Sequence, residues 1–335
     1  MHITEKAIIL AGGSGKRFWP RSTEEKPKQF LQLMSDKSLI QETFYRARRL
    51  VTAPNVYVVA NANHSKHIYD QLTKLPKENI IFEPAAKNTA AAIALGISKM
   101  NDDDVVIVMP SDHFIRDEKN LQPFIHLAFK SAAEKDVIVT LGIYPSKPET
   151  GYGYMEVDKE LLETWNFPFK VKRFHEKPNL ETATFYVESG NFVWNSGIFF
   201  FKVSTMWNAF KKYMPDLYKA FKETDWDIKK IYNSLEPISI DYGVMEKADN
   251  VVVIPLNVEW NDVGSWDAVY DLMPKDKNGN FKESEDVIFR NAQNCAVFDK
   301  DHHVVVSHLE DVIVVIEGKN VLVTKRGTTQ DVKNL

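Results

Sequence analysis

The chain has 335 residues, of which 44% are hydrophobic and 26% charged, and its formal net charge is −4 at pH 7. This composition is typical of a soluble globular protein, and the acidic balance argues against a general nucleic-acid binder. Cys295 is the only cysteine, which excludes an internal disulfide and favours a reducing compartment. We expect a cytoplasmic protein with no membrane association, because no apolar run could span a bilayer and no signal core follows the N-terminus.

The first half of the chain alternates short apolar runs with amphipathic segments. The runs are continuous and rich in Val and Ile, at 7–11, 56–60, 105–109 and 137–142. Such runs are typical of strands buried on both faces of a parallel sheet. Residues 38–50 and 88–100 place apolar side chains at helical spacing, and Ser38 followed by Gln41 indicates a capping box. This alternation predicts an α/β fold, a doubly wound Rossmann-like mixed sheet that is mostly parallel.

The middle and the end of the chain differ from this pattern. Aromatic-rich stretches that suggest strands around a pocket occupy 151–157, 169–178 and 192–203. Two helical stretches and a core strand follow, around 204–222, 226–234 and 250–256. After about residue 285, short strands at close intervals predict a small all-β, β-helix-like region. We therefore expect a catalytic domain at 1–273, a linker at 274–287 and a β domain at 288–335.

The segment LAGGSGKRFWP, residues 10–20, runs from a predicted strand into glycines that would let backbone N–H groups approach an anion. Phe18 stands where the dinucleotide fingerprint needs its third glycine, which disfavours a nicotinamide-dependent oxidoreductase. A Walker A loop is also excluded, because Leu10 replaces its first glycine and Arg17 its hydroxyl residue. By composition alone the basic loop would be a solvated surface. Its spaced cations would equally suit a polyphosphate.

The segment LAGGSGKRFWP, followed by KPKQF, resembles the sugar-1-phosphate nucleotidyltransferases, and most of all their mannose-1-phosphate guanylyltransferase branch. Similar segments continue in that family's order over roughly residues 5–270, as FEPAAKNTAAAIAL, VMPSDHFI, GYGYMEV, RFHEKP, NSGIF and EWNDVGSWDA. The resemblance implies an enzyme that forms GDP-mannose and pyrophosphate from GTP and mannose 1-phosphate with Mg²⁺. Separately, we expect a homodimer, for which the C-terminal β region is a reasonable place of contact. A uridylyl- or thymidylyltransferase acting on glucose 1-phosphate remains open, as does a sugar-nucleotide-binding subunit without turnover.

The chemistry of such a transfer limits what the protein must supply. The attacking sugar phosphate is already an anion, so alignment and charge neutralisation suffice. Asp112 follows the predicted strand at 105–109, at the carboxyl end where open α/β sheets bind ligands. Asp262 lies just beyond another strand, and the two carboxylates would suit Mg²⁺. Taken singly, each aspartate would more often be a helix cap.

The remaining roles rest on the resemblance. Arg17 and Lys28 would hold the β- and γ-phosphates, with weaker candidates in Lys16, Arg21 and Lys26. The implied catalytic residues are Arg17, Lys28, Asp112, Lys177 and Asp262. The implied nucleotide-binding residues are Leu10, Ala11, Gly12, Gly13, Ser14, Gly15, Lys16, Arg17, Lys28, Glu83, Pro84, Asn88, Thr89, Ser111 and Asp112. The implied sugar-phosphate site comprises Gly153, Glu156, Lys177, Asn195 and Asp262.

Overall fold

The computed structural model describes residues 3–335 except 14, 117, 163, 165–166 and 224–226. The chain divides into two compact units, each assembled from segments that are distant in the sequence. The first unit comprises Met1–Gly12, Thr43–Ser111 and Ile115–Trp260, and the second comprises Gly13–Glu42, Asp112–Phe114 and Asn261–Leu335. The domain boundaries expected from the sequence, at 273 and 287, stay a prediction. Among the described residues, no helix has both the length and the apolar character needed to cross a membrane.

The first unit is built on a ten-stranded sheet. Its strands are β1 (Glu5–Ala11), β2 (Val56–Asn61), β3 (Ile80–Glu83), β4 (Val105–Pro110), β6 (Ile138–Ile143), β7 (Gly153–Glu156), β8 (Phe169–Lys170), β9 (Arg173–Glu176), β10 (Phe192–Lys202) and β11 (Val251–Leu256). Two further short strands, β5 (Phe114–Ile115) and β12 (Trp260–Asn261), contain boundaries between the units.

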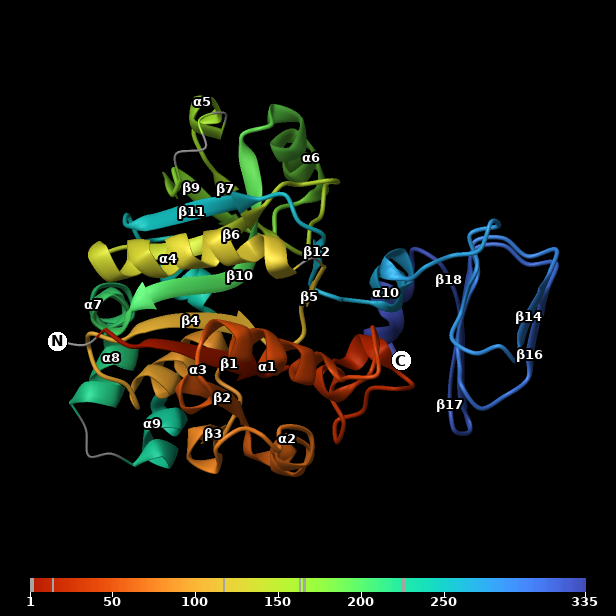
Figure 1. Cartoon of the computed structure of the whole chain (residues 1–335), viewed down its shortest axis with the longest axis horizontal. Coiled ribbons are helices and arrows are strands. Elements are labelled where there is room, and N and C mark those ends of the chain that lie inside the picture. Colours follow the sequence, from red (N-terminus) through yellow and green to blue (C-terminus); the bar gives the residue numbers. More distant parts are fainter. Residues whose placement is uncertain (1–2, 14, 117, 163, 165–166, 224–226) are drawn as a thin grey trace. The chain divides into compact units, whose positions relative to one another are not determined.

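The strand order is β3-β2-β1-β4-β10-β6-β11-β8, with β7 and β9 branching from β10 (Figure 1). Strands β3, β2, β1 and β4 are mutually parallel, and so are β6 and β11. Because β10 is antiparallel to both β4 and β6, those two groups run in the same direction. The expected mixed, mostly parallel sheet is therefore confirmed, with β10 as an inserted antiparallel strand.

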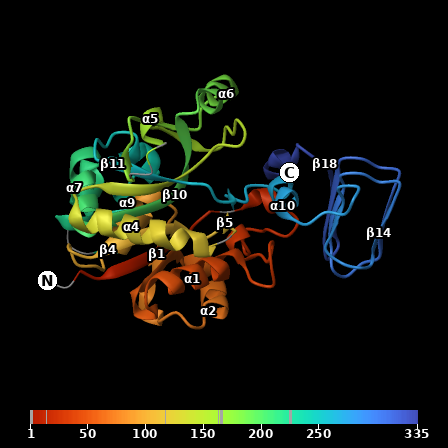
Figure 2. The ribbon, with the colours of Figure 1, turned by 45° about the horizontal axis from the view of Figure 1, so that its top comes forward.

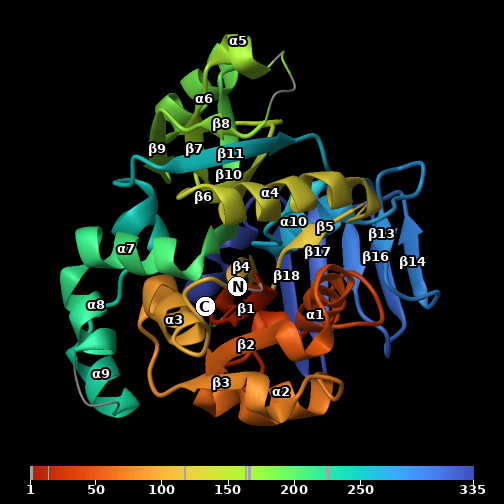
Figure 3. The same cartoon turned by 60° about the vertical axis from the view of Figure 1, so that its left-hand side comes forward.

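Helices cover both faces of this sheet. They are α2 (Ser65–Gln71), α3 (Asn88–Ile97), α4 (Gln122–Glu134), α5 (Lys159–Leu162), α6 (Leu180–Ser189), α7 (Val203–Tyr213), α8 (Pro215–Lys222) and α9 (Ile228–Ser234), with a π-helix at Asp241–Met245. Phe200 of β10 packs on Phe129 of α4, whereas its neighbours Phe199 and Phe201 share a core with α3, α7 and α8. Successive strand residues point to opposite faces, so the fold is doubly wound, as Figure 3 shows.

Helix α1 (Leu39–Leu50) begins in the second unit and ends in the first. Its expected capping box is present: the Ser38 N–H donates to Gln41 Oε1 at 3.0 Å, and the Gln41 N–H donates to Ser38 Oγ at 3.4 Å. This reciprocal pair satisfies two backbone donors that the helix itself cannot.

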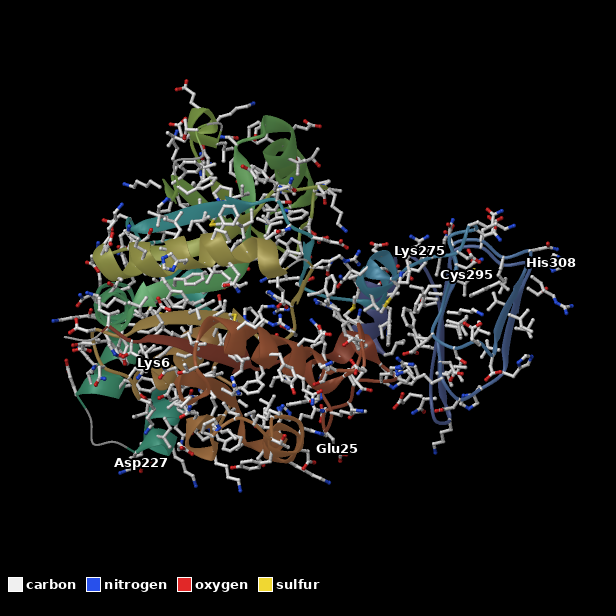
Figure 4. The ribbon with its side chains drawn as sticks, in the orientation of Figure 1. Lys6, Glu25, Asp227, Lys275, Cys295 and His308 are labelled. Carbon is white, nitrogen blue, oxygen red and sulfur yellow. The ribbon has the colours of Figure 1, made fainter. Side chains whose placement is uncertain are left out.

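The second unit ends in a small β region. Its strands are β13 (Phe281–Lys282), β14 (Val287–Arg290), β15 (Ala296–Phe298), β16 (Val304–Ser307), β17 (Val312–Glu317) and β18 (Asn320–Lys325). From β13 to β17, successive strands alternate between two sheets: β13, β15 and β17 pair in parallel in one, and β14 and β16 in the other. Strand β18 pairs antiparallel with β17 at the edge of the first sheet. Figure 2 shows β14 and β18 on opposite sides of this region. The β-helix-like region is confirmed, and Cys295 is packed in its interior, as expected (Figure 4).

A single hydrophobic core joins the distant segments of the second unit. Phe18 and Leu31 from the N-terminal loop pack with Trp266 of α10 (Trp266–Leu272) and with Phe298 of β15. Phe281 of β13 belongs to the same core, although it lies in the stretch expected to be a linker. The loop that follows the glycines is therefore fixed to α10 and the β strands.

Candidate active site

A cavity of about 360 Å³ lies within the second unit. It is lined by Gly15, Lys16, Arg17, Phe18, Lys28, Asp112, His113, Asp262, Gly264 and Lys333. The structure thus brings together the residues that the sequence predicted for the triphosphate and the metal ion: Lys16, Arg17, Lys28, Asp112 and Asp262. That these residues act on a nucleotide stays a prediction.

Lys28 is the centre of this cavity's polar contacts. Only 7% of its surface is exposed, and its Nζ donates to Asp112 Oδ2 at 2.9 Å and to the Asp262 carbonyl oxygen at 2.6 Å. A buried ammonium needs such partners to offset its lost hydration. Burial raises the pKa of Asp112, but the charge and hydrogen bond of Lys28, with His113 nearby, bring this pKa below its usual range. Asp112 is therefore an anion at neutral pH.

The glycine turn explains how Lys28 reaches this position. Gly13 and Gly15 both have positive φ, at 99° and 59°. A Cβ on Gly15 would lie 2.4 Å from Lys28 Cβ and 2.6 Å from Lys28 N, so any other residue would push Lys28 away. Phe18, which breaks the dinucleotide fingerprint, is buried and packs edge-on against Trp266. Ser14, also predicted to bind nucleotide, lies outside the described residues.

Asp262 begins a strained loop ahead of α10. The next residue, Val263, has a φ of 49°, which costs a β-branched residue about 1–3 kcal/mol. Its N–H donates to Asn261 Oδ1 at 2.6 Å, and Gly264 gives the Asp262 carboxylate space. Ser265, and not Asp262, caps α10 by accepting from the Ala268 N–H. The helix-cap alternative for Asp262 is therefore wrong.

The weaker cation candidates occupy different surroundings. Arg21 is bidentate to Glu283, at 3.0 and 2.5 Å, and its guanidinium lies over the Trp266 ring. Arg21 thus links the basic loop to the β region through Glu283, and it does not line the cavity. Lys26 is exposed and does not line the cavity either, whereas Lys16 lines it with a largely exposed side chain.

A second polar cluster lies within the first unit. Asn195 of β10 donates from Nδ2 to Asp241 Oδ1 at 3.0 Å and accepts from Thr140 Oγ1 at 3.1 Å. Lys177 follows β9 with a φ of 49°, and its Nζ lies 2.6 Å from Glu176 Oε1. Burial, together with the charge of Glu176, raises the pKa of Asp241 to about 7 against the opposing effect of Lys177. Asn195, Glu176, Lys177 and Asp241 thus form one interacting group.

Glu176 and Asp241 were not predicted from the sequence. A Cβ on Gly153 would lie 2.5 Å from Glu176 Oε2, so the predicted glycine makes room for that carboxylate. The signal for Glu176 was its place in RFHEKP beside Lys177. Nothing in the sequence around Asp241 marked it, because its partners come from β9 and β10.

Glu156, which was predicted for the sugar site, is not part of this cluster. It lies at the far end of β7, three residues from Gly153, and strand alternation turns the two positions to opposite faces. Its carboxylate is 3.2 Å from Arg173 Nη2 and accepts from Asn191 Nδ2 at 3.5 Å. Its role in binding sugar stays a prediction.

The candidates for the nucleoside lie in the first unit at strand ends. Leu10 and Ala11 end β1, Glu83 ends β3, and Ser111 follows β4. Their neighbours in the predicted set are Gly12, Pro84, Asn88 and Thr89. This is the carboxyl edge of the parallel strands, where open α/β sheets bind ligands.

Two of these nucleoside candidates have unusual polar surroundings. Glu83 is 7% exposed and accepts from the Tyr232 hydroxyl at 2.9 Å. Burial raises the pKa of Glu83 to about 7, although the tyrosine bond opposes it. Ser111 Oγ is buried and has no hydrogen-bond partner among the residues that the structure describes. A hydroxyl in that state is one that a ligand could satisfy.

Comparison with known proteins decides the family. The family described as nucleotidyl transferase matches residues 6–279. The chain belongs to this family. It is 40% identical to a mannose-1-phosphate guanylyltransferase of Salmonella montevideo, over 98% of this chain and 72% of that protein. It is 37% identical to the alginate biosynthesis protein AlgA of Pseudomonas aeruginosa, over 98% of this chain and 70% of that protein.

A solved structure agrees with this assignment. The Thermus thermophilus protein named mannose-1-phosphate geranyltransferase matches with a TM-score of 0.90 at 28% identity, over 99% of this chain and 98% of that one. The family resemblance and the fold expected from the sequence motifs are therefore confirmed.

Proposed function

We propose that this chain is a mannose-1-phosphate guanylyltransferase that forms GDP-mannose and pyrophosphate from GTP and mannose 1-phosphate. The names of its relatives support the reaction, at identities of 37–40% over nearly the whole chain. The observation that carries the mechanism is the cavity in which buried Lys28 contacts both Asp112 and Asp262 beside Arg17. A uridylyl- or thymidylyltransferase acting on glucose 1-phosphate is the nearest alternative.

The cavity residues would act on the leaving pyrophosphate. The sugar phosphate oxygen attacks the α-phosphorus of GTP, and the bond from that phosphorus to the bridging oxygen of pyrophosphate breaks. Negative charge then develops on the leaving group, and Arg17 and Lys28 would neutralise it. Lys28 is held in advance by its two oxygen partners, so little reorganisation is needed during the reaction.

Asp112 and Asp262 would hold Mg²⁺ in this cavity. Both line it, and Asp112 is kept anionic by its surroundings. The described residues contain no group of three or more His, Cys, Asp or Glu that could enclose a metal ion. Two carboxylates suit Mg²⁺, which keeps several waters and completes its shell with substrate phosphates. When bound, the ion would supply positive charge to the triphosphate.

The residues of the first unit would bind the sugar phosphate and the nucleoside. Lys177 would neutralise the attacking phosphate, while Asn195, Glu176 and Asp241 offer the amide and carboxylate groups that sugar hydroxyls need. Glu83 would be an acceptor for guanine N–H groups, and the buried hydroxyl of Ser111 would meet the ribose. Gly153 would let the backbone approach the sugar ring.

We further propose a cytoplasmic homodimer that contacts through its β region. The edge strand β18 exposes Val321 and Val323, at 53% and 63%, which is unusual for apolar side chains on an edge.

Pyrophosphate release measured across a grid of nucleoside triphosphates and sugar 1-phosphates tests the reaction. We expect GTP with mannose 1-phosphate to give the highest kcat/KM, and activity to require a divalent cation. Preference for UTP or dTTP with glucose 1-phosphate would select the alternative enzyme. Binding of GDP-mannose without turnover of any pair would indicate a regulatory subunit. Lys28→Ala should abolish most activity, while Lys26→Ala, a nearby lysine outside the cavity, should not.

A further inference from the structure

The cavity that contains Lys28, Asp112 and Asp262 has a further cation from the far end of the chain. Lys333 lines it, from the 3₁₀ helix η8 (Thr329–Asn334). The family's motifs in this sequence end near residue 270, and neither they nor the proposed mechanism accounts for this lysine.

Helix η8 is fixed to the segments that carry the other cavity residues. Thr329 is fully buried, donates from Oγ1 to Asp267 Oδ2 at 2.6 Å, and accepts from the Asp267 N–H at 3.0 Å. Val332 is buried in the same core as Phe18 and Trp266. Asp267 lies in the first turn of α10, directly after the Asp262 loop. The backbone of Lys333 is therefore held in place at the cavity.

Helix η8 also packs against η1 (Lys16–Phe18), which carries Arg17. The cavity thus receives cations from two adjoining short helices and from Lys28. Lys28 is already paired with Asp112, whereas Lys333 has no ion pair among the residues that the structure describes. Because the Lys333 side chain is exposed, its ammonium can bind an incoming anion at little desolvation cost.

We propose that the Lys333 ammonium binds the oxygens of the β- and γ-phosphates of the nucleotide, and of free pyrophosphate in the reverse reaction. The proposal rests on the proposed function for the identity of the anion. It makes η8 part of the triphosphate site and gives the β region's C-terminal segment a direct contact with substrate.

Titration calorimetry of pyrophosphate, with and without MgCl₂, on the full chain tests this contact. We expect Lys333→Ala and Lys333→Gln to raise the Kd about fivefold, and Lys333→Arg to stay near wild type. The effect should shrink in high salt, because the contact is exposed. Lys325→Ala removes an exposed lysine of β18 that does not line the cavity and serves as the control. Unchanged melting temperatures would exclude unfolding of the variants.

Kinetics separate this proposal from the proposed function. In active enzyme, Lys333→Ala should raise the KM for pyrophosphate and leave the KM for mannose 1-phosphate unchanged. An unaltered Kd in Lys333→Ala, an equal loss in Lys325→Ala, or no binding of pyrophosphate to the wild type would overturn it. A wild type that binds pyrophosphate through Lys333 but does not turn over GTP and mannose 1-phosphate would refute only the proposed function.

Discussion

Replacing Lys28 with Met tests the central contact of the cavity, because Met keeps much of the side-chain volume and removes the charge. The ammonium makes two hydrogen bonds, at 2.9 Å to Asp112 and 2.6 Å to the Asp262 carbonyl. Breaking a fully buried ion pair costs about 3–5 kcal/mol. The Asp112 side chain is 29% exposed, so water can partly replace the lost partner. We expect the free energy of unfolding to fall by about 1–3 kcal/mol at pH 7.

The same substitution should also lower kcat, and by a factor larger than the loss of stability alone would produce. Removing one preorganised group that stabilises developing charge costs about 10²–10³ in kcat. Both directions should suffer, because pyrophosphate is the substrate of the reverse reaction. Pyrophosphate release and GDP-mannose pyrophosphorolysis measure the two directions, with Lys26→Met as the matched control. A variant in which only the KM for mannose 1-phosphate rises would contradict the role given to Lys28.

The pH dependence of stability and a double mutant test whether Lys28 and Asp112 stabilise the fold through their interaction with each other. The pKa of Asp112 is lowered in the folded state, so its contribution to stability is present above the unfolded pKa, near 4, and is lost as the pH falls below it. The difference in the free energy of unfolding between wild type and Lys28→Met, measured by urea titration, should therefore become smaller at low pH. The double mutant Lys28→Met, Asp112→Asn should have a free energy of unfolding no lower than that of Lys28→Met alone. Additive effects of the two substitutions would show that the side chains do not interact.

Three further outcomes follow from the geometry. Because the pKa of Glu83 is raised to about 7 in the folded state, this residue stabilises the fold at pH values below its ordinary pKa of 4.5. This contribution, about 3 kcal/mol at most, is lost as the pH rises to 7. Urea titrations at pH 5 and 8 should therefore show a smaller decline in the free energy of unfolding for Glu83→Gln than for wild type. Lys177→Ala should raise the KM for mannose 1-phosphate at least tenfold with little change for GTP in steady-state assays, and an effect confined to GTP would contradict its placement. Arg21→Lys should destabilise the protein by about 1–2 kcal/mol in denaturant titrations, because lysine cannot bind Glu283 with two parallel bonds, and a variant as stable as wild type would refute that role.

Two opposing influences act on the protonation of Glu83: burial favours its neutral form, and the hydrogen bond from the Tyr232 hydroxyl favours its ionised form. The single hydroxyl proton of Tyr232 faces two acceptors, Glu83 Oε1 at 2.9 Å and the Ala91 carbonyl at 3.3 Å. Burial nevertheless outweighs the bond from the tyrosine hydroxyl, so the neutral form of Glu83 is favoured below about pH 7. A guanine that offered N–H groups to Glu83 would favour the ionised form instead. Nucleotide binding and proton release from Glu83 should therefore be coupled.

The parallel strands could be predicted from the sequence, but the direction of β10 could not. Continuous Val and Ile runs marked β1, β2, β4 and β6, because burial on both faces leaves no polar alternation. Strand β3 is only four residues long and half-buried, which is too little signal to separate from a loop. The aromatic stretch of β10 was recognised as a strand. Its antiparallel pairing depends on partners far away in the chain.

The cluster of Asn195, Glu176, Lys177 and Asp241 shows why residue type alone was not enough to choose between glutamates. Glu156 and Glu176 both end short strands in aromatic stretches, and the family resemblance favoured Glu156. Register brings Glu176 into the cluster, because Gly153 pairs with Glu176 across β7 and β9, whereas strand alternation sends Glu156 to the opposite face. The role of Glu156 in binding sugar stays a prediction. Asp241 was missed for a related reason, since its contacts with Asn195 and Lys177 exist only in the folded chain.

The basic loop contains cations that composition cannot tell apart, yet the fold gives each a different task. Lys28 is buried and joined to two aspartate residues, Arg21 is bound to Glu283, and Lys26 remains exposed. The difference follows from what each can reach: Gly15 lets Lys28 approach the turn, while Arg21 lies over Trp266. Of these three cations, Lys28 is the one that lines the cavity, beside Arg17. Substitution of Lys28 should therefore alter catalysis first, substitution of Arg21 should alter stability first, and substitution of Lys26 should alter neither.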